Sequence, residues 1–528
     1  MAEGVDIQFK KRFARNLLSN IIFFVLNIII GLLLVPFFLD SLGTSAYGLV
    51  PLATSITTYV VLVINALNTT ISRFLTIDIQ RNEPEKINKT FNTALFGLLG
   101  LIAILLPFIL FFAFLAPSIF DIGTVDPVDV VVLFSLVFGA SLIRTWGSSF
   151  MVVLFAYNHL DKRNYVNIIN LLIQLVTVIL LFVILGPSLP AIGISYFFAA
   201  IVSVIAAYFL SKNVCPVLKI SPRYFSKKSF KEIGSASIWF TFNDIGFFIR
   251  MQIALVIVNL LFGPSANTEY SLAVTWSGLV ASLGSLITTL FTPAIYSSYS
   301  KGDNVGMIRF SARAMKLTGF FAALCIGMVC IFAPQLLTIW VGEEFAYLAP
   351  LVCMVVIPAY FNILEGCAGT IFTAFLKIRA PTFANLATGG LNVVLAIFFA
   401  SVLDMGLYGI ALGSGISIFL YSVVFKMTYG AHVAGAHPLA LSKSLIPGLI
   451  ALACLTGFGF MVTSIITIDS IISLILAGGI ISATYLLILT KFVLNISEQK
   501  IIRDAIPKPI QKLIPSWIWK KGDINETK

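Results

Sequence analysis

Long apolar segments recur along the chain and are separated by short polar loops. Each segment reaches about 20 residues, the length that a helix needs to cross the hydrocarbon core of a bilayer. Strands of a transmembrane barrel would be about half as long and would alternate apolar with polar positions. The pattern therefore predicts an all-α polytopic membrane protein. Its fourteen transmembrane helices are expected at residues 17–39, 47–68, 92–116, 129–155, 166–186, 189–210, 236–262, 269–297, 312–333, 348–376, 383–403, 406–427, 446–467 and 470–491.

The basic residues alternate between successive loops in the way that this helix count requires. Of the 34 lysines and arginines, all except Arg144 and Arg250 lie in the termini or in every second loop and the helix ends beside it. The remaining loops contain acidic residues but no Lys or Arg. Lys and Arg concentrate on the cytoplasmic side of membrane proteins. We therefore expect a multi-pass protein of the cell (inner or cytoplasmic) membrane with both termini in the cytoplasm.

The second part of the chain repeats the first. A shift of 223 positions places Asn20 on Asn243 and Asn27 on Arg250, and the shift falls slowly to 216 further along. Each copy contains six helices, an even number, so both copies would enter the membrane from the same side. The predicted parts are an N-lobe at 1–210, a cytoplasmic linker at 211–235, a C-lobe at 236–427, two additional helices at 446–491 and a cytoplasmic tail at 492–528.

Polar residues interrupt the two helices that begin the copies. Asn20 and Asn27 are seven positions apart on the first helix, as are Asn243 and Arg250 on the helix at 236–262, so each pair shares one face. We expect these faces to line a central polar cavity together with the helices that follow them. The alternative is that the asparagines only link neighbouring helices by hydrogen bonds.

Four ionisable residues are predicted to lie deep in the membrane, which is costly and typical of functional positions. They are Arg144, Asp244, Arg250 and Glu365. Counted from the nearest basic residue in a cytoplasmic loop, the arginines lie near the midplane and the carboxylates roughly 9 Å closer to the cytoplasm, at about 1.5 Å per residue. The alternative is that all four form structural ion pairs.

Composition excludes several other classes of function. The chain is 59% hydrophobic and 11% charged, and its net charge of +11 is explained by the loops, so no nucleic-acid partner is expected. His159, His432 and His437 form no spaced ligand set, and the six cysteines match no metal motif. A phosphate-binding Gly-rich loop with its Lys is absent. We therefore expect no enzyme, no metal site and no cofactor.

Three short stretches near the start of the chain carry a family resemblance: NLLSN at 16–20, PFFLxxLGxxxYGL at 36–49 and ISRF at 71–74. With fourteen helices and a six-plus-six repeat, the sequence resembles the polysaccharide flippases (O-antigen, or Wzx-type, translocases) of the multidrug/oligosaccharidyl-lipid/polysaccharide (MOP) exporter superfamily. The resemblance implies a flippase that moves polyprenyl- or dolichyl-phosphate-linked oligosaccharide across the cell membrane by alternating access, for polysaccharide or surface glycan biosynthesis. Its implied partners are that lipid-linked oligosaccharide, membrane lipids and other polysaccharide-assembly proteins.

Two alternatives to a flippase stay open. A cation-coupled drug or metabolite exporter of the same superfamily usually has twelve helices, so the additional pair at 446–491 argues against it. A membrane-embedded glycosyltransferase or polymerase would need a large catalytic acidic loop, and the outer loops at 117–128 and 334–347 are too short to suggest one.

The deep charges suggest a mechanism for the leading interpretation. Arg144 and Arg250 stay protonated even when buried, so they would bind a phosphate or sugar carboxylate, assisted by the asparagines of the two matched faces. Asp244 and Glu365 would couple transport to H⁺ or Na⁺, because burial and a nearby Arg shift a carboxylate's affinity in opposite directions. A different ion affinity in the two conformations would then bias alternating access.

Overall fold

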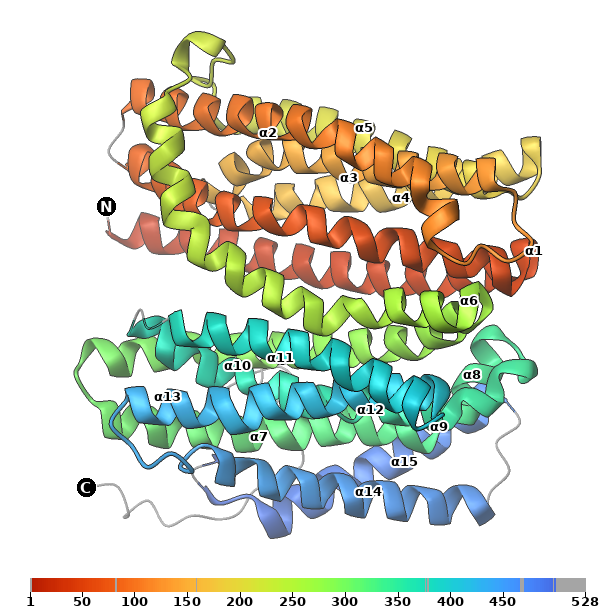
Figure 1. Cartoon of the computed structure of the whole chain (residues 1–528). Helices are drawn as coiled ribbons and strands as arrows, with labels where there is room; N and C mark the ends of the chain where they lie inside the picture. The colour runs from red at the N-terminus through yellow and green to blue at the C-terminus, as the bar shows by residue number, and fades with distance from the viewer. Residues whose placement is uncertain are drawn as a thin grey trace. The chain divides into compact units, whose positions relative to one another are not determined.

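The computed structural model describes residues 2–80, 83–157, 159–375, 377, 379–465, 470–496 and 498–499. Within these ranges the chain forms helices and no strand (Figure 1). Twelve helical segments are long and apolar enough to cross a membrane. Two of them, in α1 (Ala2–Gln80) and α6 (Lys227–Ser300), each contain two helices joined at a glycine. The described residues thus carry fourteen helices of membrane-spanning character, which confirms the predicted fold class.

The breaks in α1 and α6 are built in the same way. Gly43 has φ 77° and ψ 170°, and Gly263 has φ 82° and ψ −177°. A side chain disfavours positive φ, and glycine adopts it without that penalty. Each glycine lies at the turn between the first two helices of one predicted copy of the repeat. The two copies therefore share a backbone device as well as aligned asparagines.

The other long helices follow the predicted order, and several consist of consecutive pieces. The single helices are α2 (Pro84–Ile119), α3 (Pro127–Ala156), α4 (Leu160–Leu185), α5 (Leu189–Val214), α7 (Asn304–Ile331) and α14 (Ile446–Ile465). The composite helices are α9 (Ala349–Val356) with α10 (Ala359–Ala374), α11 (Arg379–Ile397) with the π-helical η3 (Phe398–Val402), α12 (Gly406–Phe419) with the π-helical η4 (Leu420–Met427) and α13 (Thr428–Val433), and α15 (Ile471–Ile488) with the π-helical η6 (Leu489–Val493). The short elements are η1 (Pro222–Tyr224), α8 (Ala333–Val341), η2 (Glu343–Leu348) and η5 (Ser442–Leu445).

Local sequence explains where several helices begin. Asp126 caps α3, because its carboxylate accepts a hydrogen bond from the backbone N–H of Val128 at 2.8 Å. Pro127 follows at the first helical position, where the missing N–H costs nothing. At the start of α15, Ser470 and Ser473 form a reciprocal capping box.

The chain divides into two compact units. The first unit contains Met1–Leu272 and Arg379–Ser417, and the second contains Ala273–Ile378 and Ile418–Lys528. In the first unit, an apolar core joins the second helix of α1 to α2 and α3 through Leu75, Phe91 and Phe150, which are 1–2% exposed. The lobes predicted from the repeat are a different division of the chain, and their boundaries stay a prediction.

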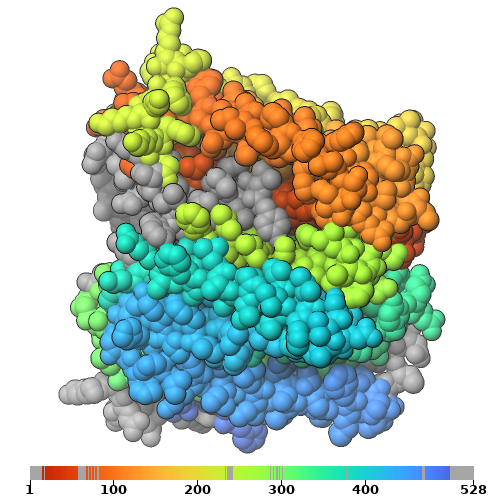
Figure 2. Space-filling model, in the orientation of Figure 1, coloured from red at the N-terminus to blue at the C-terminus, as the bar shows by residue number. Residues whose placement is uncertain are grey.

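Large apolar side chains are exposed on α2, which is orange in Figure 2. Phe108, Phe111 and Phe114 are 69%, 63% and 68% exposed and follow one another at a spacing of three residues. Water would make such a ridge unfavourable, whereas lipid tails solvate it. The ridge therefore fits a helix that faces the hydrocarbon core.

Candidate functional site

The first helix of α1 is tied to α4 by polar side chains. The Asn164 amide donates to the Asn20 Oδ1 at 2.6 Å and to the Ser19 hydroxyl at 3.0 Å. One turn earlier, the Asn16 Oδ1 accepts the backbone N–H of Asp161 at 3.0 Å. Asn164 is 6% exposed. Asn20 therefore links two neighbouring helices by a hydrogen bond, which is the alternative to cavity lining given for the asparagines in the sequence analysis.

The corresponding helix of the second copy is tied to α11 in the same manner. The Asn385 amide donates to the backbone carbonyl of Asn243 at 3.0 Å, and the Asn243 Oδ1 lies 3.4 Å away. Asn20 and Asn243 are aligned by the sequence repeat, and each accepts an amide from an asparagine of the fifth helix of its own copy. In each predicted copy, therefore, an asparagine of the fifth helix holds the first helix through an amide hydrogen bond. A role of Asn20 or Asn243 in substrate binding stays a prediction.

The next aligned positions, Asn27 and Arg250, differ between the two copies. Asn27 is exposed on α1, whereas Arg250 on α6 is 1% exposed. The guanidinium carbon of Arg250 lies 5.7 Å from the centre of the Phe247 ring, within the range of a cation–π contact. The Asn392 amide donates to the backbone carbonyl of Arg250 at 2.9 Å. A permanent positive charge is therefore held inside the first unit at one of the two equivalent positions.

The other deep charges of the first unit lie in less enclosed surroundings. Arg144 is exposed on α3, and Asp244 is part-buried on α6. Their predicted roles, anion binding for Arg144 and ion coupling for Asp244, stay predictions.

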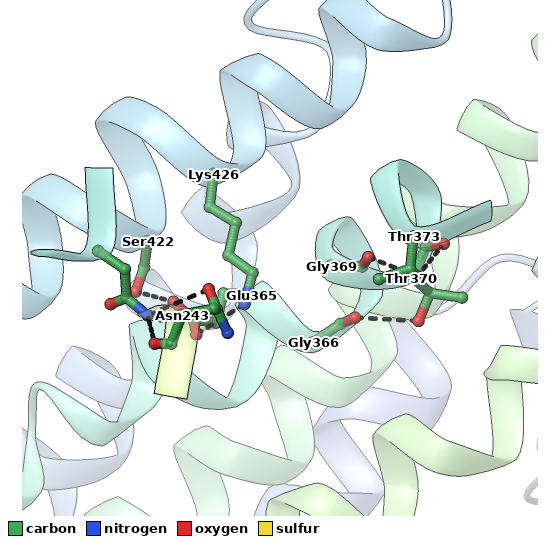
Figure 3. A network of polar contacts seen from close by, with 9 residues as sticks. Asn243, Glu365, Gly366, Gly369, Thr370, Thr373, Ser422 and Lys426 are labelled. Atoms are coloured by element: carbon green, nitrogen blue, oxygen red, sulfur yellow. Dashed lines mark hydrogen bonds and ion pairs between the residues drawn. The ribbon is translucent and has the colours of Figure 1, made fainter. Parts of the chain in front are cut away.

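Glu365 on α10 belongs to the second unit and is fully engaged there (Figure 3). Lys426 Nζ lies 2.9 Å from its Oε1, and the Ser422 hydroxyl donates to its Oε2. The side chains of Lys426 and Glu365 are only 14% and 6% exposed. The sequence pattern places Lys426 at the end of the span predicted at 406–427. Lys426 lies in η4, and α13 continues the helix beyond it to Val433.

Small and hydroxylated residues line α10 beyond this ion pair. The Thr370 hydroxyl donates to the Gly366 carbonyl at 3.1 Å, and the Thr373 hydroxyl donates to the Gly369 carbonyl at 2.9 Å (Figure 3). A Cβ added at Gly369 would come within 3.2 Å of Lys426 Cε. Glycine at this position therefore leaves room for the lysine stem to cross α10.

An apolar groove lies between α7, α14 and α15 in the second unit. Its volume is about 710 Å³. Ile446, Ile450 and Ile488 on its walls are more than half exposed, so the groove opens at the surface. The hydroxyl of Tyr485 inside it donates to the Phe320 carbonyl at 2.9 Å and is thereby satisfied. The groove is suited to a flexible hydrocarbon chain.

A metal site of the usual ligands is not formed in the described part of the chain. Among those residues, no three His, Cys, Asp or Glu side chains are grouped closely enough to hold an ion.

Comparison with known proteins identifies the family. The family model described as "Polysaccharide biosynthesis protein" matches residues 13–299, more than half of the chain. The chain belongs to this polysaccharide biosynthesis protein family. A relative in Bacillus subtilis (strain 168), the uncharacterized membrane protein EpsK, is 29% identical over 503 residues, covering 93% of this chain and 97% of that protein.

Solved structures share the fold of this chain, among them a transporter of the MOP superfamily. An inward-facing multidrug resistance MATE family transporter of that superfamily matches with a TM-score of 0.66, 14% identity, and coverage of 79% of this chain and 95% of that chain. The lipid II flippase MurJ in an inward closed conformation matches with a TM-score of 0.61, 14% identity, and coverage of 89% and 97%. At 14% identity these likenesses establish the fold alone. Together with the family match they confirm the resemblance found in the sequence.

Three residues that make the polar contacts described above were not predicted from the sequence. The pairing of Lys426 with Glu365 was not predicted, because Lys426 lies at the end of a predicted helix, where a lysine is common. Asn392 carried a usable signal, since it is an amide inside the apolar span predicted at 383–403, where an unpaired polar group is costly. Asn164 lies just before the span predicted at 166–186 and carried no such signal. The spacing of the repeat alone did not show which helix each amide would bind.

Proposed function

We propose that this polysaccharide biosynthesis family member is a flippase that moves lipid-linked oligosaccharide across the cell membrane by alternating access. Its family and fold are those of flippases and transporters. The observation that carries the proposal further is the apolar groove between α7, α14 and α15. The additional helices α14 and α15 build most of this groove. A polyprenyl or dolichyl tail would lie in it while the glycan crosses the membrane.

A lipid-linked sugar also needs a place for its anionic linker. We assign this role to Arg250 and Arg144, with Asn27, Asn20 and Asn243 as the accompanying amides. The burial of Arg250 favours this assignment, because a charge-assisted hydrogen bond strengthens where water is excluded. Lys443 among the residues lining the groove adds a further cation. Other polysaccharide-assembly proteins are the expected partners, and both termini are expected in the cytoplasm.

Reconstitution tests this function directly. Purified protein in liposomes should speed the transfer of a fluorescent polyprenyl-diphosphate-linked oligosaccharide between leaflets, measured by quenching from outside. The same glycan without its lipid should not cross. If a cationic drug crosses instead and the lipid-linked glycan does not, the protein is an exporter of small molecules and the flippase proposal is wrong.

Variants at Arg250 test the anion site. Arg250→Gln should slow flipping about 10- to 100-fold, because one charge-assisted hydrogen bond contributes about 1.5–3 kcal/mol. Arg250→Lys keeps the charge and should retain more of the rate. The contact with Asn392 uses the backbone carbonyl of residue 250, so both variants keep it. A folded Arg250→Gln protein that flips at the wild-type rate would remove Arg250 from the substrate site.

The carboxylates Asp244 and Glu365 are our candidates for coupling flipping to H⁺ or Na⁺. A proton or sodium gradient imposed on the same liposomes should change the flipping rate. Glu365 already forms an ion pair with Lys426, so it could bind a free cation only if this ion pair separated.

A further inference from the structure

A tethered ammonium group occupies the position where a free cation would bind Glu365. Both carboxylate oxygens are engaged, one by Lys426 Nζ at 2.9 Å and the other by the Ser422 hydroxyl (Figure 3). The carboxylate belongs to α10, and Lys426 and Ser422 belong to η4, so these contacts join two helices of the second unit. Glu365 is 4% exposed. A charge this well enclosed needs a close counter-ion, and the chain supplies one itself.

The surroundings of Lys426 are shaped for its ammonium group. Its Nζ lies 5.5 Å from the centre of the Tyr421 ring and 5.9 Å from that of the Phe372 ring. Aromatic faces attract a cation and replace part of its hydration. Gly369 gives the aliphatic stem a path across α10, since a Cβ there would stand 3.2 Å from Lys426 Cε. The lysine is therefore held by specific packing from both helices.

We propose that Lys426 is the resident cation of the Glu365 carboxylate, so that this site binds no free Na⁺ in the wild-type protein. A sodium ion would have to displace an ammonium that is covalently attached to the adjacent helix and therefore present at a high effective concentration. It would also leave the displaced ammonium buried between two aromatic rings. This inference refines the ion coupling of the proposed flippase and leaves Asp244 as the candidate for a free ion.

Removing the lysine should convert the site into one that binds sodium. In Lys426→Met the Glu365 carboxylate and the Ser422 hydroxyl would remain as oxygen ligands after the ammonium group is removed, and oxygen is the donor that hard cations prefer. An ion that binds only the folded protein raises its melting temperature. Sodium should therefore stabilise the Lys426→Met variant although it does not stabilise the wild type.

The experiment compares thermal melting of the purified full chain in NaCl and in choline chloride at equal ionic strength. We expect no sodium-specific shift for wild type, a lower melting temperature for Lys426→Met that NaCl raises by several degrees, and no sodium response for the double variant Glu365→Gln/Lys426→Met. Lys301→Met is the matched control, because Lys301 is an exposed lysine on the same unit. It should melt like wild type in both salts.

Two results would overturn the proposal. One is a sodium-specific stabilisation of wild type that disappears in Glu365→Gln, which would show sodium bound beside the lysine. The other is a folded Lys426→Met protein without any sodium response. If Lys426→Met does not fold, radioactive ²²Na⁺ binding decides: equal binding by wild type and Glu365→Gln supports the proposal, and weaker binding by Glu365→Gln contradicts it. None of these measurements uses a glycan, so their outcome is independent of the flipping assay.

Discussion

Asn392 is the residue at which the internal packing of the first unit can be tested most sharply. Its side chain is fully buried and joins three helices. Its amide donates to the Arg250 carbonyl on α6 at 2.9 Å, and its Oδ1 accepts from the Ser414 hydroxyl on α12 at 3.1 Å. Asn392→Ala removes both links and adds no bulk. We expect it to destabilise the folded protein without abolishing folding.

The size of the effect follows from what the contacts are worth in a membrane. An interhelical side-chain hydrogen bond there contributes about 0.6 kcal/mol on average and about 1.7 kcal/mol at most. Two such bonds give about 1.2 kcal/mol, which is roughly an eightfold change in the unfolding equilibrium. The loss in the free energy of unfolding should stay near about 1.2 kcal/mol, because in Asn392→Ala the Ser414 hydroxyl can donate to a carbonyl of its own helix instead.

Reversible unfolding by SDS in mixed micelles measures this free energy. A double-mutant cycle with Ser414→Ala should return a coupling of about 0.6 kcal/mol, the value of the single shared bond. Asn27→Ala is the control, since this asparagine is exposed on α1, and it should change stability by less than about 0.5 kcal/mol. Unchanged stability of Asn392→Ala, or zero coupling to Ser414, would refute the reasoning.

Two further predictions concern packing and topology. Gly48→Ala should lower stability by about 1–3 kcal/mol, because the new Cβ would overlap the Pro264 carbonyl; Gly31→Ala, where the added Cβ meets nothing within 4 Å, should melt like wild type. In a background without native cysteines, Ser118→Cys should react with an impermeant thiol reagent in intact cells and Ser226→Cys only after the membrane is permeabilised, and labelling of Ser226→Cys from outside would overturn the predicted orientation.

The helix framework could be predicted because the bilayer imposes it on the sequence. A span must be long, apolar and helical, so the fourteen segments are visible without knowledge of any contact. Turns at Gly43 and Gly263 fall between predicted spans for the same reason. The short interruption at Ile357-Pro358 between α9 and α10 leaves no gap in the apolar pattern, and the proline itself is the sequence signal that indicates a kink there.

The partners of the polar residues could not be predicted in the same way. Periodicity shows that Asn20 shares a face with Asn27, but the face of a helix does not reveal which neighbour it meets. Lys426 illustrates a second limit. A long lysine stem can lie along apolar surface near a helix end while its ammonium reaches a distant carboxylate. The sequence pattern therefore shows Lys426 at a helix end but does not show that its ammonium group pairs with Glu365.

The two copies of the repeat thus share a framework and differ in their charges. Both use an asparagine of the fifth helix, Asn164 or Asn385, to hold the first helix, so this contact is explained by packing alone. Packing alone does not require Arg250 at a position where the other copy has Asn27, because the exposed asparagine is compatible with the same framework. A buried charge introduced into only one copy costs stability and is kept where function uses it. The asymmetry between the copies, more than the polar faces themselves, therefore makes Arg250 our first candidate for binding the anionic group of the proposed substrate.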